Sequence, residues 1–144
     1  MPHRNLMDVI RNKPLVVGFL ETTALDAAKQ MADKGVGSVV VIANGQLAGI
    51  FTERDLLNRV VANELDPART YLAQVMTSNV VGIEFDKPFT HALHLMNMNS
   101  CRHIPVLMKG MPIGMVTARD ALTIEWQTFN QECDAADHIA EVMA

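Results

Sequence analysis

Gly49-Ile50-Phe51-Thr52-Glu53-Arg54-Asp55-Leu56-Leu57 is a stretch that occurs twice in this chain of 144 residues. It returns 65 residues later, from position 49 to 114, as Gly114-Met115-Val116-Thr117-Ala118-Arg119-Asp120-Ala121-Leu122. The Gly, Thr, Arg, Asp and final Leu are identical in the two copies, and most of the positions around them keep their apolar character. Such a duplication is typical of a molecule built from two similar units, so fold and function are interpreted through the repeat.

The sequence around the first copy predicts the order strand, helix, strand, strand, helix. Thr22 or Thr23 can cap the first helix and Gly35 and Gly37 can end it, whereas Asn44-Gly45 is a strong hairpin signal. A β-branched run before that hairpin is typical of a strand covered on both faces. The predicted elements are a brief strand at 14–17, a helix at 23–34, strands at 38–43 and 46–51, and a helix from Thr52 to about Ala62.

The second half repeats this order after a polar linker. The predicted elements are a leading segment at 72–76, a strand at 80–84, a helix at 88–99 with Pro88 in its first turn, strands at 103–108 and 111–116, and a helix from Thr117. We therefore predict an α/β (α+β) fold with a first unit at 1–63, a linker at 64–71, a second unit at 72–128 and a C-terminal helical extension at 129–144. The apolar face of that extension is typical of a lid on the core or of a dimer contact.

Composition excludes several classes of function. The net charge is −4, and after Arg119 the chain has no Lys or Arg, which argues against binding nucleic acid or an anionic membrane surface. No apolar run approaches the ~18 residues of a membrane span, and the first eight residues lack the apolar core of a secretion signal. Cys101 and Cys133 make no disulfide framework. These features predict a soluble cytoplasmic protein.

The repeated Thr-x-x-Asp pattern has two interpretations. A Thr with an acidic residue three places later forms a capping box, which satisfies free amides at a helix start. Arg54 and Arg119 do not fit that role alone, because a cation in the first turn opposes the helix macrodipole at a cost of about 0.3–1 kcal/mol. Free amides with a guanidinium suit a phosphate, and an Asp can accept hydrogen bonds from a vicinal diol. The pattern therefore also favours a nucleotide ligand.

The duplicated Gly-apolar-apolar-Thr-x-x-Asp pattern, each copy after a hairpin, resembles the cystathionine-beta-synthase (CBS) domain. His103-Ile104-Pro105-Val106 resembles a strand signature of that family, and Val75-Met76-Thr77 resembles its leading segment. Residues 6 to 128 together resemble a free-standing tandem pair, a Bateman module. The resemblance implies β-α-β-β-α repeats about a pseudo-twofold axis. It also implies that AMP, ADP, ATP, NAD(H) or S-adenosylmethionine binds between the halves, with the motif Asp on the ribose and no obligatory cofactor.

The resemblance also implies the residues of the site. Thr52 and Asp55, and Thr117 and Asp120, would bind the ribose, with Arg54 and Arg119 beside them. The adenine ring would lie between apolar residues, Val16, Val17 and Ile50 in one half and Val81 and Met115 in the other.

The two clefts are not expected to be electrostatically equal. Where the second half has Arg102 and His103, the first half has Gly37 and Ser38. Phosphate-bearing ligands should favour the cleft that Arg102 faces, and the sequence does not say which cleft that is.

Other candidate sites are less complete. His91-x-x-His94 could lie on one helix face, but no Cys or carboxylate is spaced to complete a metal site. No catalytic constellation can be identified, so we predict a non-enzymatic sensor whose ligand state is read by an unknown effector protein. The family resemblance further implies a homodimer of the tandem pairs. The rival hypotheses are a structural dimerisation module whose motifs only cap helices, and a nucleotide hydrolase.

Overall fold

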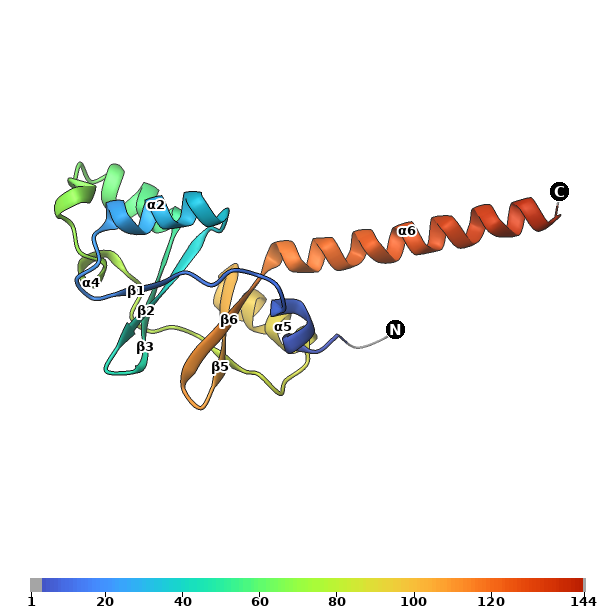
Figure 1. Cartoon of the computed structure of the whole chain (residues 1–144), viewed down its shortest axis with the longest axis horizontal. Helices are drawn as coiled ribbons and strands as arrows, with labels where there is room; N and C mark the ends of the chain where they lie inside the picture. The colour runs from blue at the N-terminus through green and yellow to red at the C-terminus, as the bar shows by residue number, and fades with distance from the viewer. Residues whose placement is uncertain (1–3, 144) are drawn as a thin grey trace.

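The computed structural model describes residues 4–143 and contains two three-stranded sheets, one built from each half of the chain (Figure 1). The first half contains α1 (Leu6–Ile10), β1 (Val17–Phe19), α2 (Ala24–Lys34), β2 (Ser38–Ala43), β3 (Gln46–Thr52), α3 (Glu53–Asp55) and the π-helical η1 (Leu56–Val61). The rest contains the short 3-10 helix η2 (Pro67–Arg69), α4 (Leu72–Val75), β4 (Ile83–Glu84), α5 (Phe89–Asn99), β5 (His103–Met108), β6 (Met111–Thr117) and α6 (Ala118–Met143).

The two sheets repeat the same topology and register. β1 and β4 run parallel to the central strands β2 and β5, which pair antiparallel with β3 and β6. Val40 faces Ile50 in the first sheet and Pro105 faces Met115 in the second, 65 residues further along. The registers shift after Val41 and after Val106, again 65 residues apart. The predicted fold class and the duplication are therefore confirmed.

Local signals placed most elements correctly. Thr23 caps α2 by accepting a hydrogen bond from the amide of Asp26, and Gly35 ends the helix in the left-handed conformation. The hairpin at Asn44-Gly45 has positive φ at both residues, 53° and 73°, as a type I′ turn requires. Lys109-Gly110 repeats that geometry with 52° and 82°. Both predicted hairpins are confirmed.

Other predicted boundaries were wrong. The strand expected at 14–17 pairs only from Val17 to Phe19, and the one expected at 80–84 pairs only at Ile83–Glu84, because the residues before each strand run along a cleft instead. Pro88 is the extended N-cap of α5 and not part of its first turn. α6 runs without a break from 118 to 143, so residues 129–143 continue the last helix of the second half.

The leading helices are exchanged between the two cores. Leu6, Val9 and Ile10 of α1 belong to the core of the second half, which contains Phe89 and Ile104. Leu72 and Val75 of α4 belong to the core of the first half, with Phe51 and Val39. Figure 1 shows α1 beside α5 at the side of the second sheet. The division of the sequence near residues 63 and 72 therefore does not coincide with the division into cores.

This exchange explains the glycine in each copy of the repeated motif. A Cβ at Gly114 would lie 2.6 Å from Cδ1 of Ile10, and one at Gly49 would lie 2.5 Å from Sδ of Met76. Each glycine lies on the last strand of its hairpin, where the leading segment of the other half crosses it. Any larger residue would push that segment away, so the glycines allow the two halves to interlock.

The halves meet at a third apolar cluster formed by Val40, Ile50 and Met115, with partly buried neighbours that include Val17. This contact fixes the two hairpins side by side and brings the start of each motif helix toward the opposite half. Beyond it, α6 extends away from the body of the molecule (Figure 1).

Candidate functional site

Two clefts open between the halves, one beside each copy of the motif. The larger cleft has a volume of about 1030 Å³ and the smaller cleft about 830 Å³. Either volume suits a small organic ligand, since ligand pockets commonly measure roughly 300–1,000 Å³. Each cleft takes its motif from one half and its apolar wall from the other, so neither half could form a cleft alone.

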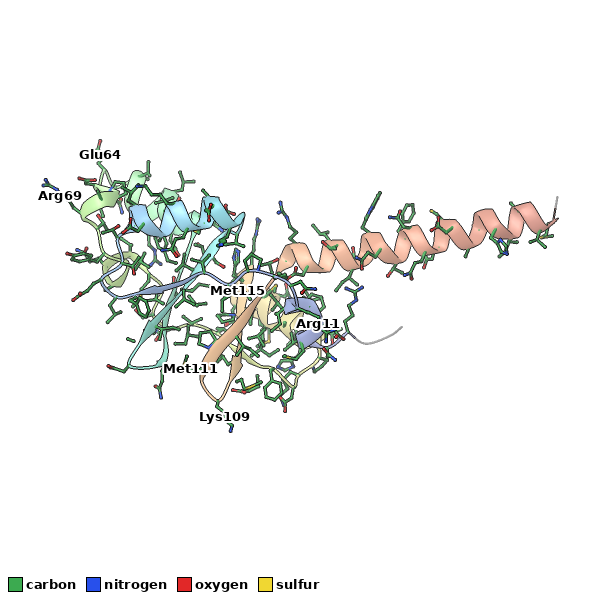
Figure 2. All side chains as sticks on the ribbon, viewed as in Figure 1. Arg11, Glu64, Arg69, Lys109, Met111 and Met115 are labelled. Carbon is green, nitrogen blue, oxygen red and sulfur yellow. The ribbon has the colours of Figure 1, made fainter. Side chains whose placement is uncertain are left out.

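The larger cleft lies over the second motif. Thr117, Arg119 and Asp120 lie at or near the start of α6, and Met115 precedes them on β6. Figure 2 shows Met115 near the middle of the molecule, where the halves meet. The opposite wall comes from the first half, namely Lys13, Pro14, Leu15, Val16, Ala28, Met31, Ala32, Gly35, Val36, Gly37, Ser38, Glu53 and Leu56.

The smaller cleft lies over the first motif. Thr52, Arg54 and Asp55 lie at the start of α3, with Ile50 before them on β3. The opposite wall comes from the second half, namely Thr77, Asn79, Val80, Val81, Asn99, Ser100, Cys101, Arg102 and His103. The segment before β4 supplies polar Thr77 and Asn79 to this cleft, whereas the segment before β1 supplies Lys13 to the larger one. The smaller cleft therefore has fewer cations.

The Asp120 carboxylate is held by groups from both halves. Its Oδ2 accepts a hydrogen bond from the Thr117 amide at 2.7 Å and lies 2.5 Å from Nζ of Lys13. Lys13 also donates to the Met115 carbonyl at 3.0 Å. The carboxylate is mostly buried, so these contacts fix its direction, and a vicinal diol entering the cleft would meet an oriented acceptor.

Asp55 makes a full capping box instead. Its Oδ2 accepts from the Thr52 amide at 3.0 Å and from the Thr52 hydroxyl at 3.1 Å, and its own amide donates to Thr52 Oγ1 at 3.2 Å. The second oxygen lies 3.5 Å from Nε of Arg59, in the next turn. The capping interpretation is thus confirmed for this copy, and among the described residues Oδ1 accepts no hydrogen bond.

The motif arginines belong to the lining of the clefts. Arg54 lines the smaller cleft, Arg119 lines the larger one, and both are exposed. Within the described part of the chain neither guanidinium has an ion-pair partner. Arg102 lines both clefts, as do His103 and Glu53, so its position alone does not single out one cleft for phosphate-bearing ligands. It lies in the wall that separates them.

His103 is the half-buried histidine of this wall. Burial lowers its pKa below the ordinary value of 6.5, with smaller effects from Glu53, which raises it, from Lys13 and Arg102, which lower it, and from Asp120, which raises it. The neutral form of His103 is therefore favoured at pH 7. A phosphate entering beside it would favour its protonated form.

The lowered pKa gives a pH dependence of stability. Below pH 6.5 the unfolded chain takes up a proton that folded His103 resists, so the free energy of unfolding should decrease as pH falls through this value. In the His103→Ser variant, which copies Ser38 of the first half, this part of the decrease should disappear. Urea unfolding between pH 5.5 and 7.5 would measure it, with His91→Ser at an exposed position as the control. Parallel curves for wild type and His103→Ser would contradict the assignment.

The structure changes the grouping of the predicted adenine-binding residues. Val16 and Met115 line the larger cleft together, and Ile50 and Val81 line the smaller one, so each pair combines one residue from each half. Val17 lies in the central cluster and not in a cleft wall, because successive residues of a strand point to opposite sides.

Sequence reasoning missed Lys13 and Glu53 as site residues. Lys13 is 107 residues from Asp120, so no local pattern could join them. Glu53 occupies a position at which the two copies of the motif differ, because the equivalent residue of the other copy is Ala118. That difference in charge is the sequence signal that could have identified Glu53.

The remaining predicted features add no second site. His91 and His94 are both exposed on α5, and no group of three or more potential ligands that could hold a metal ion occurs among the described residues. Cys101 is half-buried at the smaller cleft, and burial raises the pKa of its thiol, which makes it less reactive. No helix within residues 4–143 combines the length and apolar character needed to cross a bilayer.

Comparison with known proteins points to one family. The CBS domain model matches residues 7–62 and 72–126. An uncharacterised protein of Methanopyrus kandleri is 31% identical over 118 residues, which cover 81% of this chain and 60% of that protein. A mitochondrial CBS domain-containing protein of Arabidopsis thaliana is 36% identical over 108 residues, 71% of this chain and 52% of that protein. The chain thus spans less than two thirds of either relative.

A solved structure extends the likeness to the whole fold. The CBS domain protein PAE2072 from Pyrobaculum aerophilum, determined in complex with AMP, superposes with a TM-score of 0.75 at 25% identity, covering 87% of this chain and 99% of that one. Its likeness spans both repeats. With two matched repeats, two interlocked sheets and a motif helix at each cleft, this chain belongs to the CBS domain family as a tandem pair.

Proposed function

We propose that this chain is a non-catalytic regulatory module that binds adenine nucleotides in the clefts between its two CBS repeats. The observation that carries the proposal is the composition of both clefts: a fixed motif carboxylate, an exposed arginine at a helix start and an apolar wall from the opposite half. A carboxylate suits a ribose diol, the arginine suits a phosphate and the apolar wall suits a purine. The AMP complex of the Pyrobaculum protein supports the same ligand class.

The proposed output is a change in the packing of the two halves that an effector protein reads. Each ligand would contact both halves, because each cleft is built from both. A ligand shifts a conformational equilibrium only by its different affinity for the two states. A ligand that contacts both sides of an interface provides such a difference. Ligand binding can therefore change the orientation of the two halves relative to each other.

Thermal unfolding with AMP, ADP, ATP, NAD, NADH and S-adenosylmethionine tests the proposal directly. A ligand at about 100 times its Kd should raise the free energy of unfolding by about 2.7 kcal/mol, so the melting temperature should rise with ligand concentration. Cytidine nucleotides at equal concentration serve as the control for non-specific phosphate effects. No shift with any adenosine compound at millimolar concentration would rule the sensor out.

A structural dimerisation module is the second candidate function. It is favoured by the complete capping box at Thr52 and Asp55, which gives that motif a role without a ligand. This candidate predicts a stable dimer whose melting temperature is unaffected by nucleotides. The melting series therefore separates the two functions.

Dimerisation itself is proposed for both functions, through the apolar face at the start of α6. Leu122 and Trp126 are 67% and 62% exposed, and Phe129 packs on Trp126 with ring centroids 5.8 Å apart. Leu57 and Val61 repeat the first two positions 65 residues earlier and are also exposed. Large apolar side chains gathered in this way are typical of a protein interface.

Replacing Leu122 and Trp126 by Glu should weaken the dimer by on the order of a hundredfold, because the charges would be desolvated at the interface. Sedimentation velocity over a range of concentrations would measure the change. In the wild-type chain on dilution, and in a chain with Leu122→Glu alone, the emission of Trp126, the single tryptophan, should shift to the red on dissociation. Met111→Glu at the exposed hairpin tip is the matched control. A wild-type chain that stays monomeric at all concentrations would contradict the prediction.

A further inference from the structure

The pseudo-symmetry of the two clefts is broken by charge at one pair of contacting positions. In the first half the Glu53 amide donates to the Gly37 carbonyl at 3.0 Å, and in the second half the Ala118 amide donates to the Arg102 carbonyl at 3.0 Å. The backbone contact is the same, but the side chains differ in both partners. One half presents a carboxylate and the other presents a guanidinium.

The space above Gly37 is taken by the carboxylate. A Cβ at Gly37 would lie 2.9 Å from Oε1 of Glu53, so the missing side chain makes room for this acid. In the second half Ala118 is the small residue and Arg102 is the large one. The exchange places one acid and one base in the wall that both clefts share, because Glu53 and Arg102 line the larger and the smaller cleft alike.

The charges that are not shared differ between the clefts. The larger cleft has Lys13 and Arg119 against Asp120, a formal charge of +1, whereas the smaller cleft has Arg54 against Asp55, a formal charge of 0. The first phosphate-bearing ligand should therefore enter the larger cleft. There its phosphate would attract the Arg102 guanidinium, because a guanidinium forms strong hydrogen bonds to phosphate oxygens.

We propose that the larger cleft binds phosphorylated adenosine ligands together with Arg102, and that the smaller cleft is thereby left for adenosine compounds without a phosphate. The inference rests on the proposed function and assigns a ligand class to each of its clefts. Once Arg102 is engaged on the other side, the smaller cleft keeps Arg54 against Asp55 and Glu53, a formal charge of −1. A second phosphate there meets net repulsion, whereas a neutral or cationic adenosine does not.

Titration calorimetry and methyl NMR of the full chain test the assignment with ATP and adenosine as probes. The Val16 methyls report on the larger cleft and the Val81 methyls on the smaller one, and the two residues pack in different cores. ATP should shift the Val16 signals at the lower concentration, and adenosine added to the ATP-saturated protein should then shift the Val81 signals. The ATP complex should bind adenosine more tightly than it binds a second ATP.

The Arg102→Gly variant copies the first half and removes the shared guanidinium. ATP affinity in the larger cleft should fall by about tenfold or more, as expected for the loss of a charged hydrogen bond to phosphate. Adenosine affinity should change less than twofold. Arg54→Ala is the matched comparison, since it removes a cation of the smaller cleft alone and should weaken ATP binding less than Arg102→Gly does.

The possible failures are distinguishable. If neither compound shifts either set of methyl signals, both the proposed function and this inference are wrong. If ATP binds both clefts with equal affinity, or if Arg54→Ala weakens ATP more than Arg102→Gly does, the division of ligands is wrong while the sensor function stands. Equal melting temperatures of the unliganded variants would show that any loss of affinity is not a loss of folding.

Discussion

Asp120→Ala is expected to weaken the binding of adenine nucleotides in the larger cleft by about a hundredfold. The carboxylate is oriented by the Thr117 amide and by Lys13, and it is the one mostly buried acceptor at the start of α6 that lines this cleft in the described structure. A ribose diol would lose two hydrogen bonds to a charged acceptor, each worth about 1.5 kcal/mol or more. Titration calorimetry with AMP and ATP would measure the loss.

The effect on folding should be smaller than the effect on binding. Asp120→Ala removes an acceptor at a helix start and a partly exposed ion pair, which together contribute about 1 kcal/mol. Asp120→Asn keeps the size of the side chain and an acceptor for the Thr117 amide, so it separates the cap from the charge. Asp55→Ala should act in the same way on the smaller cleft. Lower stability with unchanged nucleotide affinity would leave these residues with a capping role only.

Leu6→Ala is expected to lower the free energy of unfolding by about 2–5 kcal/mol, although the residue lies near the start of the chain. Leu6 is fully buried, and it packs in the core of the second half with Phe89 and Ile104. Truncation leaves a cavity in that core, whose residues outside α1 begin at Val81 and so lie far from Leu6 in sequence. Urea unfolding followed by circular dichroism would measure the change.

The matched variant is Leu72→Ala, which makes the equivalent truncation in α4 and should cause a similar loss in the core of the first half. Met7→Ala, one residue from Leu6 and exposed, should change stability by less than about 0.5 kcal/mol. If Leu6→Ala were as mild as Met7→Ala, the docking of α1 on the second core would be wrong.

The strongest sequence predictions came from local and periodic signals. Thr23 and Gly35 bounded α2 because capping depends only on residues within one helical turn. The turns at 44–45 and 109–110 were found because a two-residue hairpin needs residues that tolerate positive φ. The short strands before α2 and α5 were misplaced because only two or three residues of each pair with a neighbouring strand. Such short segments show no clear alternation of apolar and polar residues.

The candidate sites were predictable only in part. The motif residues were identified because they recur at one offset, but the groups that face them come from the other half. Val16 joins Met115 and Lys13 joins Asp120 across more than 95 residues of sequence. Such pairs depend on how the two sheets are placed, which no local pattern encodes.

The sequence by itself determined the duplication, the order of strands and helices, the motif residues and the family. Each of these depends on residues close together in the sequence or on a repeat at one offset. The tertiary structure alone decided that α1 and α4 exchange cores, that each cleft combines both halves, and that Arg102 stands between the clefts. The physical reason is burial: neither half can cover its apolar sheet without the helix of the other. The exchange of α1 and α4 completes the two cores, and it holds together the two halves whose residues line both clefts.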